Sequence, residues 1–169
     1  LNPVVTYDAP GKYEIVLAAT TFGQCVNIHR DTVVIHPTPV VDFTFDNVCS
    51  YDSLVLINNT TIDYTDVSYH WAFGDSTTST MASPSYLYKR PDSYFITLAA
   101  TSEYGCTDSK TLMTEIHAVP KADFQANTVC RDSITKFTNL SDIISNDLSY
   151  AWDYDDGNTA SAEQPEHTY

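Results

Sequence analysis

The stretch Tyr69-His-Trp-Ala-Phe-Gly-Asp75 returns 81 positions later as Tyr150-Ala-Trp-Asp-Tyr-Asp-Asp156. The same offset relates both tryptophans of the chain, Trp71 and Trp152. It also relates all four cysteines, Cys25 to Cys106 and Cys49 to Cys130, and the alignment needs no gap. A fixed period of this length is the signature of tandem structural modules, so one unit of 81 residues has to explain the fold.

The domain boundaries are expected at the proline-containing segments around Pro39 and Pro120. This division predicts the C-terminal half of one repeat over 1–37, a complete repeat over 38–119 and the N-terminal half of a third over 120–169. A half-repeat cannot bury a core alone. We therefore expect the natural protein to continue in both directions.

Composition excludes several function classes. The net charge is −14 and only 8 residues are Lys or Arg, which argues against nucleic acid and anionic membranes as partners. No apolar run reaches the roughly 20 residues of a membrane span, so direct membrane insertion is not expected. Hydrophobic residues make up 43% of the chain, enough for a folded core.

Short alternating segments predict an all-β chain. Within the complete repeat we expect strands at 41–45, 53–57, 69–73, 85–88, 94–99 and 107–116. Tyr69, Trp71 and Phe73 would share one face of their strand. Several such strands with turn signals between them predict an Ig-like β-sandwich.

The combined motif resembles the PKD (polycystic kidney disease) domain, whose signature is Trp-Asp-Phe-Gly-Asp-Gly, then Pro-x-His-x-Tyr and Gly-x-Tyr-x-Val. The corresponding stretches are Tyr69–Asp75, Pro84–Tyr88, Ser93–Leu98, Tyr150–Gly157 and Pro165–Tyr169. The resemblance implies structural roles for Trp71, Phe73, Asp75, Tyr88, Tyr94, Trp152, Asp156 and Tyr169. The placement of the cysteines is similar to that in large secreted adhesins of gliding Bacteroidetes-type bacteria.

The turn after the tryptophan strand departs from the family pattern. Ala72 and Ser76 replace the usual Asp and Gly, and Asp155 stands where Gly is usual. We therefore expect a turn that is not preserved from repeat to repeat, without a shared ligand site.

Two groups of residues have a possible binding role beside a structural one. Trp71 and Trp152 could stack on carbohydrate, but burial in the sandwich core is the favoured interpretation. Asp153, Asp155 and Asp156 are weak candidates for Ca²⁺, the one cofactor considered, against capping of the turn by their side chains. No catalytic set of residues is recognised, so we do not expect an enzyme.

The cysteines are candidates for disulfides between repeats. Cys49 follows the first strand of its repeat and Cys106 lies in the last hairpin turn, at opposite ends of strands about 30 Å long. A disulfide needs Cα atoms within about 7 Å, so a Cys49–Cys106 bond is disfavoured. The cysteine after the first strand is expected to bond the hairpin cysteine of the following repeat, which for Cys49 lies near position 187. Free thiols remain the alternative.

Together these observations predict an extracellular, non-catalytic stalk or spacer of a cell-surface adhesin, with a part in gliding motility. Its direct partners would be neighbouring repeats, and other domains would contact protein or polysaccharide surfaces. The alternative is a binding accessory of a secreted hydrolase such as a protease or chitinase. That role predicts an exposed aromatic stripe in every repeat, yet the candidates do not recur at the offset of 81: Phe22, Tyr51, Tyr64 and Tyr104.

Overall fold

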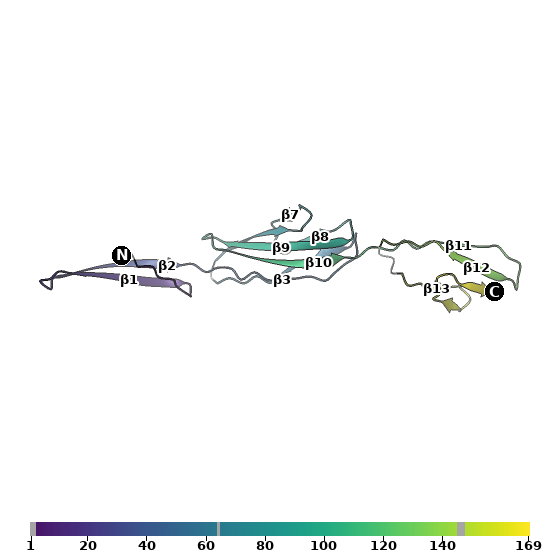
Figure 1. Cartoon of the computed structure of the whole chain (residues 1–169), viewed down its shortest axis with the longest axis horizontal. Helices are drawn as coiled ribbons and strands as arrows, with labels where there is room; N and C mark the ends of the chain where they lie inside the picture. Colours follow the sequence, from purple (N-terminus) through teal and green to yellow (C-terminus); the bar gives the residue numbers. More distant parts are fainter. Residues whose placement is uncertain (1–2, 64, 145–147) are drawn as a thin grey trace. The chain divides into compact units, whose positions relative to one another are not determined.

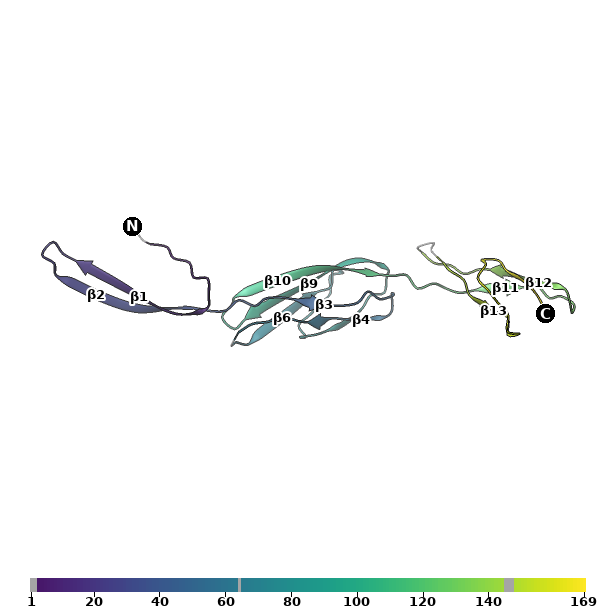
Figure 2. The same cartoon turned by 90° about the horizontal axis from the view of Figure 1, so that it is seen from below.

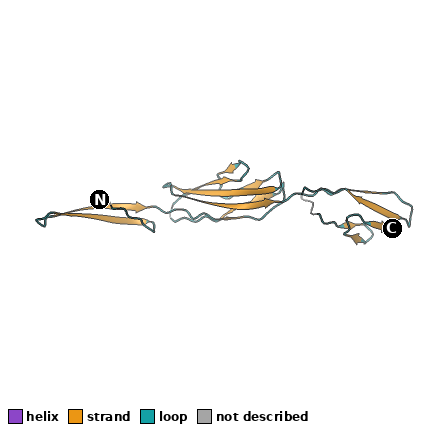
Figure 3. Cartoon of the chain, viewed as in Figure 1, coloured by secondary structure: helices purple, strands orange, loops and turns teal. Residues whose placement is uncertain are grey.

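The computed structural model describes residues 3–63, 65–144 and 148–169. All regular structure in these ranges is β-strand, joined by loops and turns (Figure 3). No described segment forms a helix long and apolar enough to cross a membrane. The predicted all-β, Ig-like class is confirmed.

The chain divides into two compact units. The first contains residues 1–46, 54–86 and 93–114, and the second contains residues 47–53, 87–92 and 115–169. Each is described below by its own strands, which Figure 1 labels.

The first unit begins with a long hairpin of β1 (Gly11–Thr20) and β2 (Val26–Ile35). The two strands pair antiparallel over their full length, from Gly11 opposite Ile35 to Thr20 opposite Val26. The turn is closed by backbone bonds from Thr21 to Cys25 and from Gln24 to Thr21, with Gln24 in the left-handed region at φ 63°. Most residues of both strands are exposed.

The central sandwich follows. One sheet has the order β10-β9-β6-β7, formed by Thr107–Ile116, Asp92–Ser102, Val67–Ala72 and Thr78–Ser79. Opposite it, β3 (Phe43–Thr44) pairs with β5 (Ile57–Asn58), and β4 (Ser53–Val55) pairs with β8 (Ser85–Leu87). The turned view in Figure 2 shows β9 and β10 as the long strands of this sandwich.

The core lies between these sheets. Trp71 of β6 is fully buried and meets Phe43 of β3 edge-on, with ring centroids 5.0 Å apart. Alternate residues of β9 point inward, so Ile96, Leu98 and Ala100 are also fully buried. A fully buried Ile or Leu side chain contributes about 1.5–3 kcal/mol relative to exposure, so Ile96 and Leu98 stabilise this layer.

Strand bounds differ from the sequence prediction where a backbone N–H donates to a side chain or to a loop carbonyl. The strand predicted over 41–45 is reduced to β3 because the Val41 N–H donates to the Asp108 carboxylate. The strand predicted over 53–57 is divided at Leu56, whose N–H donates to the Pro84 carbonyl. In contrast, β10 has the bounds predicted, and β7 was not predicted.

In the second unit, residues 120–169 repeat the plan of the central sandwich's N-terminal part. The strand β12 (Ile134–Asn139) pairs with β11 (Phe124–Ala126) on one side and β15 (Glu166–Thr168) on the other. A short ladder joins β13 (Trp152–Asp153) to β14 (Thr159–Ala160). Even the isolated bridge between Val40 and Thr61 has its equivalent 81 positions later, between Lys121 and Asp142.

Candidate functional site

The turn after β6 holds the most connected carboxylate of the central repeat. Asp75 accepts hydrogen bonds from the Thr77 N–H at 3.1 Å and from the Tyr86 hydroxyl at 2.6 Å. The Tyr86 ring stacks on Phe73, with centroids 4.2 Å apart and planes 7° from parallel. Burial alone would raise the pKa of the Asp75 carboxyl, but the bonds from Thr77 and Tyr86 hold it below its ordinary value.

The third repeat has the same arrangement with one ring exchanged. Asp156 accepts from the Asn158 N–H at 3.0 Å, and its other oxygen lies 2.7 Å from His167 Nε2. The His167 ring stacks on Tyr154 at 4.2 Å and 3°. The His167 bond, and then the bonds from Asn158, lower the pKa of the Asp156 carboxyl. Tyr86 and His167 therefore do the same structural work at equivalent positions.

The expectation that this turn differs between repeats was wrong. Gly74 and Ser76 both have positive φ, 85° and 74°, and the equivalent Asp155 and Gly157 have 60° and 88°. In both turns the residue between the two positive-φ positions is an aspartate, Asp75 or Asp156, and its side chain accepts a backbone hydrogen bond that stabilises the turn. Asp155 can take the place of Gly74 because an aspartate tolerates positive φ better than most residues.

These bonds favour a structural role for the carboxylates. Both oxygens of Asp75 and of Asp156 already have donors within the protein. One oxygen of Asp153 also has a donor, because its Oδ1 accepts from the Asp155 N–H at 3.0 Å. The described residues include no group of three or more His, Cys, Asp or Glu arranged to hold a metal ion. Calcium binding at Asp153, Asp155 and Asp156 stays a prediction.

The structure places the two tryptophans in matching contacts but unequal surroundings. Trp71 Nε1 donates to the Met81 carbonyl and Trp152 Nε1 to the Ala162 carbonyl, both at 2.9 Å. Trp71 is fully buried, which leaves no face for a sugar. Trp152 is only half-buried and meets Phe124 edge-on at 5.2 Å.

The remaining motif tyrosines differ in their exposure to solvent. Tyr88 is buried, Tyr94 is half-buried and Tyr169 is exposed. Among the aromatic residues considered for a binding stripe, Phe22, Tyr51 and Tyr104 are exposed, while Tyr64 lies outside the described residues. The Tyr104 ring stacks on His36 with centroids 3.6 Å apart.

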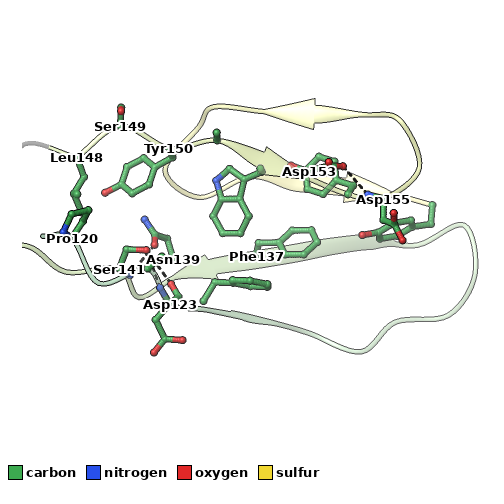
Figure 4. A pocket seen from close by; sticks show the side chains of 16 residues that line it. Pro120, Asp123, Phe137, Asn139, Ser141, Leu148, Ser149, Tyr150, Asp153 and Asp155 are labelled. Atoms are coloured by element: carbon green, nitrogen blue, oxygen red, sulfur yellow. Dashed lines mark hydrogen bonds between the residues drawn. The ribbon is translucent and has the colours of Figure 1, made fainter. Parts of the chain in front are cut away.

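The third repeat has an open hollow of about 690 Å³. Its aromatic lining includes Phe124, Phe137, Trp152 and Tyr154, and Asp123 lies at its wall. Figure 4 shows Phe137 and Tyr150 pointing into the hollow from opposite walls. Sequence reasoning missed this hollow.

All four cysteines are free in the structure. Cys49 forms a parallel bridge with His117, directly after β10, and Cys106 directly precedes the same strand. Ten residues of extended strand span about 33 Å, far beyond the reach of a disulfide. Cys25 and Cys130 are exposed, and Cys49 and Cys106 are half-buried.

Comparison with known proteins identifies one family. The model of the PKD domain matches residues 36–116 and 117–169. PKD domains are generally non-catalytic modules and are typical of extracellular or secreted proteins. A search of curated proteins finds no match.

Similar solved structures include two Vibrio domains. The PKD1 domain of Vibrio anguillarum Epp is 26% identical, with a TM-score of 0.45, covering 48% of this chain and 96% of that one. The PKD1 domain of the Vibrio cholerae metalloprotease PrtV is 26% identical, with a TM-score of 0.41, covering 49% and 99%. Carbohydrate-binding modules of the β-sandwich superfamily are 16% identical, with a TM-score of 0.45, covering 61% and 54%.

Proposed function

Because the chain belongs to the PKD domain family, we propose that it is a non-catalytic extracellular spacer. It would form part of the stalk of a large cell-surface adhesin of the kind that gliding bacteria secrete. The observation that carries this proposal is the adjoining pair of family matches, 36–116 and 117–169, with no linker between them. Modules that follow one another directly suit a role in which the number of repeats sets a distance.

The side-chain chemistry supports a spacer. In both repeats each oxygen of the turn aspartate accepts a hydrogen bond from its own repeat, which gives the carboxylate a structural role. The net charge of −14 favours a soluble, mutually repelling surface. Interactions with protein or polysaccharide would then belong to other domains of the protein.

The spacer proposal is tested by small-angle X-ray scattering on arrays of two, four and eight complete repeats. We expect the maximum particle dimension to rise by a constant amount per repeat. A dimension that levels off as repeats are added would contradict a distance-setting role.

We further propose that the joints are covalent in the natural array. Cys49 would bond the hairpin cysteine expected near position 187 in the next repeat, and Cys106 would bond the equivalent of Cys49 in the preceding repeat. The position of Cys49 at the far end of β10 from Cys106 supports a bond between repeats over one within a repeat. Such a bond would restrict motion between modules.

The second candidate function is an accessory binding module of a secreted hydrolase. The exposed aromatic side chains of Phe22 and Tyr51 favour it. Co-sedimentation of this chain with chitin, cellulose or fibrillar collagen tests it directly. Saturable binding that is lost in Phe22→Ala or Tyr51→Ala would support this candidate over a passive spacer.

Calcium would be compatible with either role. We propose Asp153, Asp155 and Asp156 as the weak site, and a melting scan of the chain in calcium and in EDTA tests it. An unchanged melting temperature would contradict calcium binding at these aspartates.

A further inference from the structure

The sheet β10-β9-β6-β7 of the central repeat has one side that points away from the core. Alternate residues of β9 such as Ile96 and Leu98 are buried, so the residues between them point to solvent. We call this side the outer face. It consists of the odd-numbered residues 95–101 of β9, the odd-numbered residues 107–113 of β10 and the even-numbered residues 68–72 of β6. All of them lie in the first compact unit and within the family match 36–116.

The outer face carries no formal charge. None of its residues is Asp, Glu, Lys or Arg, in a chain whose net charge is −14. Its only titratable side chain is that of the exposed His70. A charged ligand would find no oppositely charged partner here, and covering this face removes no charged group from water. These properties favour a ligand without charge.

Most side chains of the outer face carry a hydroxyl. They are Ser68, Thr97, Thr101, Thr107, Ser109 and Thr111. Thr97 and Thr111 lie side by side on neighbouring strands, with their Oγ1 atoms 2.8 Å apart. The hydrogen bond between them uses one of their two O–H protons, so the second proton and the remaining lone pairs can bond a ligand. The face therefore offers both donors and acceptors.

One end of the outer face is apolar. Phe95 is 63% exposed and Met113 is 58% exposed. Each lies two residues beyond the Thr97–Thr111 pair on antiparallel strands, so the two side chains are neighbours. On the opposite flank the backbone of Phe95 approaches Gly74, which has no side chain to cover the ring. Phe95 thus presents an open aromatic surface.

The combination of this ring with the hydroxyls matches a sugar chain. A pyranose ring has a C–H face that packs on an aromatic ring, and its hydroxyl groups both donate and accept hydrogen bonds. Binding sites of this kind pair an apolar surface with a few placed polar groups that fix orientation. The strand from Phe95 to Thr101 is about 20 Å long, which leaves room for several sugar units along β9.

We propose that the outer face of the central repeat binds a neutral polysaccharide. The chain lies along β9, with one sugar stacked on Phe95 and the following sugars bonded by the hydroxyls of Thr97 and Thr111. This inference goes beyond the spacer role, because it gives the central repeat a ligand of its own. It also stands apart from the second candidate function, which rests on Phe22 and Tyr51.

The equivalent face of the hairpin β1–β2 lacks these features. At the offset of 81, Glu14 stands in the place of Phe95 and Arg30 in the place of Thr111. Their side chains form an ion pair, with Arg30 Nη1 2.6 Å from Glu14 Oε2. This pair replaces both the ring and a hydroxyl, so we expect no sugar binding there. It also shows a pair of residues that the same strands accommodate.

The test is electrophoresis of the full 169-residue chain in native gels that contain galactomannan, hydroxyethyl cellulose or laminarin, three neutral polysaccharides. We expect retardation by a neutral polysaccharide and none by alginate, which is acidic. Migration that none of the three neutral polysaccharides changes would overturn the proposal. Retardation by alginate as strong as that by the neutral polymers would contradict the argument from charge.

Variants locate the site. Phe95→Ala should weaken binding about tenfold or more, as truncation of an anchor residue does. The double variant Phe95→Glu/Thr111→Arg copies the ion pair of β1–β2, so it should fold and yet not bind. Val55→Ala is the matched control, because Val55 is 58% exposed on the opposite sheet. Unchanged binding in the double variant, or an equal loss in Val55→Ala, would overturn the assignment.

A second copy of the chain is the competing occupant of an uncharged face. Sedimentation velocity without polysaccharide, over about 1–300 µM, separates the two. We expect the unchanged chain and Phe95→Ala to sediment alike. A mass that rises with concentration in the unchanged chain but not in Phe95→Ala would assign the face to a second copy and overturn the proposal.

Discussion

Replacing Gly74 by alanine tests how closely β9 approaches the turn after β6. The new Cβ would lie 2.8 Å from the Phe95 carbonyl oxygen and 3.0 Å from its nitrogen, both backbone atoms of a central strand. Gly105 provides a matched control, because its φ of 81° is close to the 85° of Gly74 but nothing lies within 4 Å of its added Cβ. Both substitutions carry the left-handed penalty of about 1–2 kcal/mol. Only Gly74→Ala adds the clash.

The clash has to be relieved by moving β9 or the turn, and overpacking of this kind costs about 1–3 kcal/mol. We therefore expect Gly74→Ala to lower the free energy of unfolding by about 2 kcal/mol more than Gly105→Ala does. The assay is urea unfolding followed by tryptophan fluorescence in a Trp152→Phe background, where Trp71 reports on the central repeat alone. Equal destabilisation by the two substitutions would refute the close approach of β9.

Three other predictions concern the core, the turn and the joints. Leu98→Ala should lower the free energy of unfolding of the central repeat by about 2–5 kcal/mol. Leu17→Ala in the exposed hairpin should change the free energy of unfolding by no more than about 0.5 kcal/mol. Equal effects of the two substitutions in denaturant unfolding would contradict the difference in burial. The folded-state pKa of Asp75 lies below its ordinary value of 3.8, so its carboxylate stabilises the fold above that pH and loses this contribution as pH falls through the folded value. In Asp75→Asn the melting temperature should therefore fall less steeply between about pH 5 and 2 than in the unchanged chain. An equal fall in both proteins would show that the Asp75 carboxylate does not contribute to the acid sensitivity of the fold. Non-reducing peptide mapping of a longer native array should find Cys49 joined to the cysteine expected near position 187, and a bond from Cys49 to Cys106 would contradict the proposed joint.

The repeat made most of the fold predictable. An exact offset of 81 identified equivalent strands before any contact was known, and the alternation around Trp71 indicated the buried face. The prediction of β10 over Thr107–Ile116 was correct to the residue because that strand lies between a Gly-Cys turn and the segment that contains Pro120.

The strand edges were less predictable because side chains far away in sequence determine them. Val41 reads as part of a strand, yet its N–H bonds a carboxylate 67 residues away. The turn was misjudged for a related reason. Gly74 and Asp155 differ as residues, but both take positive φ. Only the structure shows that β9 approaches Gly74, a restriction that the described part of the third repeat does not impose on Asp155.

The candidate site was predictable as a motif and not as a set of contacts. The sequence placed Asp75 and Asp156 at equivalent turns, but it could not show that Tyr86 and His167 bond them in the same way. The open hollow was equally hidden, because exposure of Phe124 depends on which strands cover it.

The central claim is that the chain is a series of independent modules that serve as a spacer, and pulling a natural array by its ends tests this most directly. In reducing buffer, single-molecule force spectroscopy should show equal unfolding steps. Each step should release 81 residues, a contour length of roughly 290 Å at about 3.6 Å per residue, less the folded length of the repeat. Steps of irregular length, or a single cooperative event for the whole array, would contradict the modular account.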